Sequence, residues 1–100
     1  DSYAMFIVTG VDKAAPGFVL DGKVATARTI TEFYTKTSGG SCTATLKNGS
    51  NQIGQIATDG TGKVDSSLTN TSVSAGDRLG VVITLNTSAV DLEIVVKYTA

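Results

Sequence analysis

Residues 57–64, with the sequence ATDGTGKV, form a glycine-rich run that ends in Gly62-Lys63, as a phosphate-binding loop does. Such a loop has a glycine, four variable residues, Gly-Lys and then Ser or Thr, whose hydroxyl binds magnesium. In this chain Ala57 replaces the first glycine and Val64 replaces the hydroxyl residue. The mechanism also needs a helix after the lysine, whereas the residues after Lys63 alternate as a strand does. We therefore predict a loop between two strands and no nucleotide site.

Acidic residues are the next candidates for chemistry, because six aspartates lie mostly in or beside expected turns. They are Asp12, Asp21, Asp59, Asp65, Asp77 and Asp91. Aspartate in a turn commonly bonds to its own backbone, and this is our interpretation of these residues. The paired carboxylates of a glycosidase and a calcium site built from turn aspartates are alternatives that the sequence alone leaves open.

Histidine is absent and Cys42 is the one cysteine, so the chain offers no thiolate–imidazole pair, zinc site or internal disulfide. We expect Cys42 to be a small buried side chain on a strand. No set of residues dictates a reaction. We therefore predict that the chain is not an enzyme and that it holds no cofactor and no metal.

The charge of the chain argues against nucleic acid as a partner. Lys and Arg number 8 against 9 Asp and Glu, and the basic residues are scattered singly, whereas phosphate binding needs them clustered. The longest apolar run, YAMFIV, is far shorter than the roughly 20 residues of a transmembrane helix. We predict neither a nucleic-acid nor a membrane partner, and the 100 residues suit one domain, 1–100.

Apolar and polar residues alternate along several segments, which is typical of strands with one buried face. The clearest segments are 41–47, 78–85 (with Leu79, Val81, Ile83 and Leu85 on one face) and 91–99, and 63–68 is a weaker case. Within 51–58, Ile53 and Ile56 cannot share one face of a regular strand, which predicts a bulge near Gly54. Residues 23–36 have apolar residues at helical spacing, but their threonines favour a strand, the interpretation we adopt.

Turn residues punctuate these segments at the spacing expected of an all-β sandwich or barrel. The turns are Asn48-Gly49 and Asp21-Gly22, which suit tight hairpins, Ala15-Pro16-Gly17, which suits a type II turn, and Ala75-Gly76-Asp77. The alternation and the turns together predict an all-β fold, an antiparallel β-sandwich of seven to eight strands.

Three segments resemble, in their succession, a recurring bacteriophage virion domain. They are 42–58 (CTATLKNGSNQIGQIAT), 67–85 (SLTNTSVSAGDRLGVVITL) and 91–100 (DLEIVVKYTA). The shared features are the hairpin Lys47-Asn48-Gly49, the strand start Ala75-Gly76-Asp77-Arg78-Leu79, the closing Val95-Val96-Lys97-Tyr98 and the Asp-Gly of LDGKV at 20–24. The resemblance covers roughly residues 18–100, and similar turns occur in tumour-necrosis-factor-like and complement-like jelly rolls.

The resemblance implies a jelly-roll-like sandwich on the virion surface, in a capsid decoration protein, a head fibre or a module of a tail protein. Such a structural protein binds the major capsid protein or another virion protein, and stabilises the capsid or tail lattice or displays an adhesive surface. The alternative is a receptor- or glycan-binding module of a phage tail or fibre protein. Glycan sites usually stack sugars on exposed aromatic rings, and the absence of Trp with only three Phe and three Tyr counts against it.

The first seventeen residues carry no such resemblance, and we interpret them as an arm or an inter-subunit strand. In SYAMFIVTGV both alternation faces are apolar, with Tyr3, Met5 and Ile7 on one and Ala4, Phe6 and Val8 on the other. An edge strand of a sandwich buries one face in its own core, so the other face is expected to contact another molecule. A fully buried central strand is the alternative.

Phe33 and Tyr34 raise the same question, because neighbouring residues of a strand point to opposite faces. We therefore predict a subunit interface that contains Tyr3, Met5, Ile7 and Tyr34. The resemblance to jelly rolls implies a homotrimer, since such domains commonly close with three-fold symmetry.

Overall fold

The structure, a computed structural model, describes the main chain of residues 2–8 and 17–99 and the side chains of residues 17 and 19–99. Within these residues all regular structure is strand, in nine segments, and none is helix. The strands are β1 Ser2–Val8, β2 Gly17–Asp21, β3 Arg28–Lys36, β4 Gly39–Asn48, β5 Asn51–Thr58, β6 Lys63–Asp65, β7 Ser72–Val73, β8 Leu79–Val90 and β9 Leu92–Thr99. The predicted all-β fold class is confirmed.

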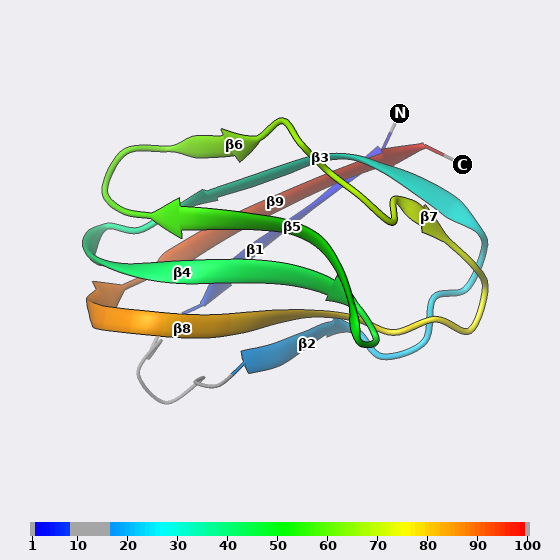
Figure 1. The fold of residues 1–100 in the computed structure, drawn as a ribbon, viewed down its shortest axis with the longest axis horizontal. Coiled ribbons are helices and arrows are strands. Elements are labelled where there is room, and N and C mark those ends of the chain that lie inside the picture. The colour runs from blue at the N-terminus through cyan, green and yellow to red at the C-terminus, as the bar shows by residue number, and fades with distance from the viewer. Residues whose placement is uncertain (1, 9–16, 100) are drawn as a thin grey trace.

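The strands form two antiparallel sheets that lie face to face (Figure 1). Sheet A has the order β1-β9-β3-β6, with β7 also paired to β3, and sheet B has the order β2-β8-β4-β5. The antiparallel β-sandwich is therefore confirmed. Nine strands are described instead of seven to eight, because the two-residue β7 has too little alternation to be read from the sequence. The expected strand 63–68 ends early, at Asp65.

The core lies between the inner faces of the sheets, where strand alternation places every second side chain. Phe33 of β3 lies in this core, is 0% exposed and is the largest fully buried side chain. Sheet A contributes Ile30, Leu92, Ile94 and Val96, and sheet B contributes Cys42, Ala44, Leu46, Ile53, Ile56, Leu79, Val81 and Ile83. Residues 23–27 form a loop before β3, yet Val24 in this loop is also buried.

Irregular pairing explains two exceptions to the alternation. In β5, Gly54 pairs with Leu46 and Gln52 with Lys47, so Ile53 is an extra residue, and both Ile53 and Ile56 are buried as the predicted bulge allows. In β8, the prediction that Leu85 faces the core is wrong, because the side chain is 81% exposed.

Two bulges in β8 cause the exposure of Leu85. The partners of Thr43, Ser41 and Gly39 in β4 are Thr84, Thr87 and Val90, so β8 gains one residue at each of two steps. Leu85 and Ser88 provide these extra residues at positive φ, 49° and 52°. A bulge reorients the side chains that follow it, and a non-glycine residue at positive φ is strained.

The turns are partly as predicted. Residue pair Asn48–Asn51 closes the β4–β5 hairpin, so the central residues are Gly49 and Ser50. Only Gly49 has a positive φ, 60°, which fits a type II′ turn with glycine first.

The prediction of a hairpin at Asp21-Gly22 is wrong, because β2 lies in sheet B and the next strand, β3, lies in sheet A. The Asp21 Oδ1 instead accepts a hydrogen bond from Lys23 N at 3.1 Å within the loop that crosses between the sheets. The turn at Ala75-Gly76-Asp77 is confirmed, with Gly76 at φ 91°. The turn expected at 15–17 lies outside the described residues.

One buried polar contact links the two sheets. The hydroxyls of Thr35 in β3 and Thr58 in β5 lie 2.7 Å apart, and Thr58 also donates to the carbonyl of Ile56 at 3.2 Å. Because each hydroxyl has one proton, Thr35 must donate to Thr58. Both side chains are at most 1% exposed, so this pair is a fixed polar contact inside an apolar core.

Candidate functional site

The predicted interface residues lie in one sheet. Tyr3, Met5 and Ile7 belong to β1 at one edge of sheet A, and Tyr34 belongs to β3, two strands away. The main-chain register places Met5 opposite Val95 of β9, and Val95 opposite Tyr34. The alternative of a central β1 is wrong, because among the described strands β1 pairs only with β9. The side chains of Tyr3, Met5 and Ile7 lie outside the described part of the chain.

Sheet A has an apolar row across its outer face, defined by the register positions Met5, Val95, Tyr34 and Val64. Val95 lies between the buried Ile94 and Val96, so it points outward. Tyr34 and Val95 are half-buried, and Val64 is 52% exposed. Apolar side chains on adjacent strands of an outward face make a contiguous patch, which is the usual sign of a contact surface.

Charged residues flank the apolar row on both sides. On one side Lys97, which pairs with Tyr3, makes an ion pair with Glu32 at 3.1 Å between Nζ and Oε2. On the other side Glu93, which pairs with Ile7, lies opposite Lys36. Each flank thus carries one cation and one anion, so the patch has an apolar centre and a charge-balanced rim, as protein interfaces do.

The Tyr34 ring is fixed from one side by the β5–β6 loop. A Cβ built on Gly62 would overlap the Tyr34 hydroxyl and would lie 2.7 and 2.8 Å from two ring carbons. Glycine at position 62 therefore lets the loop backbone pack directly on the ring. This contact explains the glycine at position 62, and residues 59–62 form a loop between β5 and β6, as predicted.

The edges of the two sheets differ in how they are protected. At the β5 edge, Thr69 N donates to Ile53 O at 2.9 Å, and Thr69 Oγ1 and Asn70 Nδ2 donate to Gln52 O at 3.0 and 2.8 Å. Strand β6 has three residues, and β2 has five with a register shift. Short strands, irregular strands and covering segments are the usual ways to block pairing at an edge.

Strand β1, with seven residues, is neither short nor irregular, and no other described strand pairs with its outer edge. All seven pair with β9 in an unbroken register, from Ser2 opposite Tyr98 to Val8 opposite Leu92. Its sequence, SYAMFIV, contains no charge and no proline. A long, regular and apolar edge strand is a site at which another chain is expected to bind.

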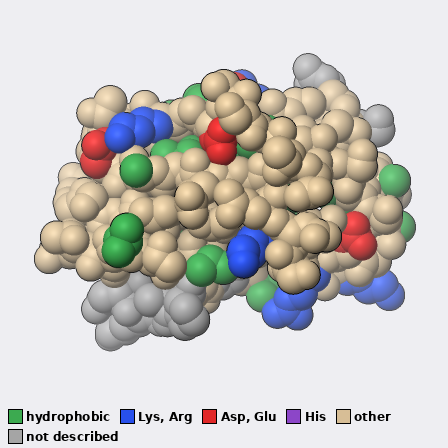
Figure 2. Space-filling view, viewed as in Figure 1, with side chains coloured by type: hydrophobic (Ala, Val, Ile, Leu, Met, Phe, Trp, Pro, Cys, Tyr) green, Lys and Arg blue, Asp and Glu red, His purple; other side chains and the backbone are tan. Residues whose placement is uncertain are grey.

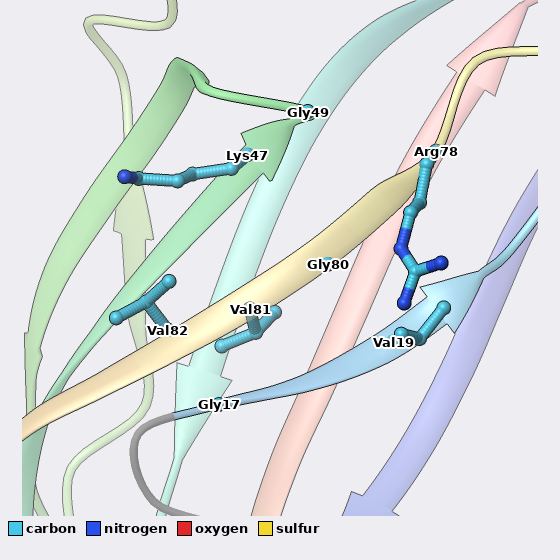
Figure 3. A pocket seen from close by; sticks show the side chains of 8 residues that line it. All are labelled: Gly17, Val19, Lys47, Gly49, Arg78, Gly80, Val81 and Val82. Atoms are coloured by element: carbon cyan, nitrogen blue, oxygen red, sulfur yellow. The ribbon is translucent and has the colours of Figure 1, made fainter.

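A second feature is a groove of about 330 Å³ on the outer face of sheet B, which we call the glycine groove (Figure 3). It is lined by Gly17, Val19, Lys47, Gly49, Arg78, Gly80, Val81 and Val82. Gly80 lies between the buried Leu79 and Val81 and so occupies an outward position, where it pairs with Val19 and Lys47. An outward position without a side chain leaves a hollow in the sheet surface.

Gly17 extends this hollow into β2, where it pairs with Val82. A Cβ on Gly17 would overlap the carbonyl oxygen of Val81, so the two strands approach too closely for any side chain there. Lys47 and Arg78 lie on opposite sides of Gly80, and the Arg78 side chain extends toward Val19 (Figure 3). The groove thus combines exposed main chain, valine side chains and two cations.

The cations of the glycine groove are not neutralised by neighbouring carboxylates of the described residues. Lys47 and Asp21 are the only charged residues in the four strands of sheet B. The Asp77 carboxylate accepts hydrogen bonds from Asn48 Nδ2 at 2.9 Å and Ser74 N at 2.8 Å. These bonds, the first above all, lower the pKa of Asp77, so this carboxylate stays ionised and links its turn to Asn48 at the end of β4.

The residues that the sequence offered for chemistry have structural contacts. Lys63 Nζ pairs with Asp59 at 3.1 Å and donates to Ala57 O at 2.9 Å. Hydrogen bonds from Thr61 N and then from Lys63 lower the pKa of Asp59. Cys42 is buried in β4, as predicted, and burial raises the pKa of its thiol.

Among the described residues, no group of three or more His, Cys, Asp or Glu side chains is placed to hold a metal ion. No helix long and apolar enough to cross a membrane occurs in the same residues.

Sequence reasoning missed Lys47, Arg78, Gly17 and Gly80 as a group. They come from β4, from the residue before β8, from β2 and from β8, and only the register brings them together. One residue could have indicated the groove from the sequence. Gly80 occupies a position at which the alternation of 78–85 predicts a side chain that points outward. Comparison of the chain with protein-family models, curated proteins and solved structures gives no match.

Proposed function

We propose that the chain is a virion structural domain, a decoration or fibre domain that binds the capsid or tail lattice of a phage and assembles as a homotrimer. The observation that carries this proposal is the outer face of sheet A, where an apolar row with balanced charged flanks reaches the unprotected edge strand β1. Such a surface fits a stable contact between proteins.

The strand order supports the jelly-roll interpretation on which the proposal rests. The orders β1-β9-β3-β6 and β2-β8-β4-β5 pair each early strand with a late one across both sheets, as a rolled pair of Greek keys does. The hairpin at Lys47-Asn48-Gly49 and the turn at 75–77 lie at strand connections, as the resemblance to virion domains implies.

The asymmetry of the apolar row favours a ring over a two-fold pair. One end of the row is the main-chain edge at β1, and the other end is Val64 on the short strand β6. A contact between the β1 side of one subunit and the Tyr34–Val64 side of the next is heterologous, and a heterologous contact forms a ring when the rotation between neighbouring subunits closes, as we propose for three subunits here. Three subunits in a ring would bind a symmetric lattice site with a gain in effective concentration.

Sedimentation equilibrium at micromolar concentration tests the assembly. We expect a species of three times the monomer mass of 10.2 kDa, and a monomer would contradict the trimer. The combined variant Tyr3→Ser, Met5→Ser, Ile7→Ser should dissociate the trimer with its β-sheet circular dichroism retained. The matched control Val19→Ser, Val82→Ser, on the outer face of sheet B, should stay trimeric.

Immunogold electron microscopy tests the location on the virion. Antibody raised against the chain should label virions purified from the biological source that encodes it, on heads or on tails. Label on host cells with none on virions would overturn the proposal. Specific binding to host-surface glycans, together with label on tail fibres, would favour the receptor-binding alternative.

A further inference from the structure

The outer face of sheet B has a different chemistry from that of sheet A and points to a second contact. Figure 2 shows this face, over β4, β5 and β8, as mainly uncharged polar side chains and backbone. Basic side chains gather at its lower right, close to the β4–β5 hairpin and the start of β8. The glycine groove lies in this part of the face, between Lys47 and Arg78.

The shape of the groove selects for an extended main chain. Gly80 removes a side chain from an outward position, so the backbone of another molecule can approach the sheet closely there, and Gly17 lets β2 pack directly against the Val81 carbonyl. Val19, which is 46% exposed, and Val82 supply apolar walls of modest size. An extended peptide turns every second side chain to the same side, and small apolar side chains at these positions fit between the two valines.

The charge of the groove selects for carboxylates. Lys47 and Arg78 flank Gly80, no acidic residue is among the described lining residues, and neither cation makes an ion pair with a carboxylate of the described residues. The two ion pairs of the described residues use Lys63 and Lys97 instead. An Arg guanidinium binds a carboxylate through two parallel hydrogen bonds, which fixes orientation as well as charge.

We infer that the glycine groove binds an extended acidic segment of a partner protein, with Asp or Glu side chains on Lys47 and Arg78 and its backbone over Gly80. A carboxylated glycan shares the charge, but no aromatic ring is among the described lining residues to stack on a sugar. The inference does not rest on the proposed trimer, because it concerns the opposite outer face of the sandwich.

The test is an NMR titration of the ¹⁵N-labelled full chain with the capped peptide Ac-Gly-Glu-Val-Glu-Gly-NH₂. We expect the amide signals of Gly17, Lys47, Gly49 and Gly80 to shift, while those of β9 remain in place. The peptide Ac-Gly-Gln-Val-Gln-Gly-NH₂ should cause no such shifts. Added salt should weaken the binding, because the charged groups are at the surface.

A charge variant and a shape variant test separately how the charge and the shape of the groove contribute to binding. Lys47→Gln with Arg78→Gln should weaken binding at least about ten-fold through the loss of charge-assisted hydrogen bonds. The matched control Lys36→Gln with Lys97→Gln, on sheet A, removes the same charge and should bind as the original chain does. Gly80→Ser should block the groove without changing charge, and an unaltered spectrum elsewhere verifies its fold.

Several results would overturn the inference. The first is that no amide signal of sheet B shifts at millimolar concentrations of the glutamate peptide. The second is that the glutamine peptide binds as tightly as the glutamate peptide. The third is that Lys36→Gln with Lys97→Gln weakens binding as much as Lys47→Gln with Arg78→Gln does. Tighter binding of an oligogalacturonate at the same amides would replace the acidic segment with an acidic glycan. Sedimentation of the Lys47→Gln, Arg78→Gln variant should match that of the original chain, so failure here is distinguishable from failure of the trimer.

Discussion

The outer faces of the two sheets differ although their inner faces are alike. Both inner faces are apolar and share one core, which contains Phe33 from sheet A and Leu46 from sheet B. Outward, sheet A carries the apolar row with balanced charges, whereas sheet B carries polar uncharged side chains, glycines and two cations. In a sandwich the inner faces determine the fold, so the outer faces are free to differ, and their difference is where function is to be sought.

The difference arises from a few residue types at outward positions. Val95 and Tyr34 occupy outward positions in the middle of sheet A, where a soluble strand usually carries polar residues. The outward Gly80 of sheet B gives a hollow in place of a side chain. One face therefore offers apolar area, and the other offers main chain and positive charge.

The largest expected effect is on stability, and it distinguishes a residue on the inner face of sheet A from its neighbour on the outer face. Phe33→Ala should lower the free energy of unfolding by about 3–5 kcal/mol, as the loss of a fully buried phenyl ring does. Tyr34→Ala, one residue later, should cost about 1–2 kcal/mol, because its half-buried ring loses only part of this burial. Urea denaturation of both variants as monomers measures the two costs. Equal costs would show that Tyr34 belongs to the fold and not to a contact surface.

A second variant tests the main-chain geometry beside the glycine groove. Gly49→Val should cost about 1–3 kcal/mol, because a β-branched residue is strained at the positive φ of this turn. The carbonyl of Arg78 accepts a hydrogen bond from Gly49 N at 2.8 Å, so the strain also reaches the groove. Thermal unfolding measures the loss, and Ser50→Val serves as the control with negative φ. An unchanged melting temperature for Gly49→Val would show that the turn has another geometry.

The hydroxyl pair between the sheets gives a smaller and asymmetric effect. Thr58→Val should cost about 1–2 kcal/mol, because it leaves the buried Thr35 hydroxyl without its acceptor. Thr35→Val should cost less than about 1 kcal/mol, because Thr58 keeps its bond to Ile56 O. Chemical denaturation of both variants and of the double variant measures the coupling. A larger loss for Thr35→Val would reverse the assigned direction of the hydrogen bond.

The smallest effect concerns pH and the turn that leads into β8. The pKa of Asp77 in the folded state lies below its ordinary value of 3.8, through hydrogen bonds from Asn48 and Ser74. The ionised carboxylate therefore stabilises the fold above about pH 4, and this contribution is lost as the pH falls through the folded pKa. Melting temperatures from pH 2 to 6 should show this acid-side decline, and Asp77→Asn should reduce it. An identical decline in the variant would assign it to other carboxylates.

Local patterns predicted much of the fold. Alternation in 78–85 and 91–99 predicted β8 and β9, and the mismatch of Ile53 and Ile56 predicted the bulge in β5. These features depend on neighbouring residues and strand geometry alone. The hairpin predicted at Asp21-Gly22 is wrong because a turn sequence does not determine whether the next strand joins the same sheet.

Other features depend on register, which local patterns do not contain. Leu85 was expected in the core, yet two bulges opposite β4 rotate it outward. Met5 and Tyr34 were expected in one interface, and the register places them in one row through Val95, but their contact with another subunit stays a prediction. The glycine groove joins residues from three strands, so no single segment contains it, and Gly80 at an outward position was the one local signal.

The two bulges of β8 have a consequence for changes in chain length. Strand β8 uses 12 residues to span the 10 residues of β4, and the two extra residues lie at the exposed end of the strand. The inward Leu79, Val81 and Ile83 come before both bulges and keep their places, whereas the buried Ala89 follows them. An insertion between Leu85 and Ser88 that returns the chain to Ala89 is therefore tolerable for the core, which makes this strand end the suitable place to graft a foreign epitope for display.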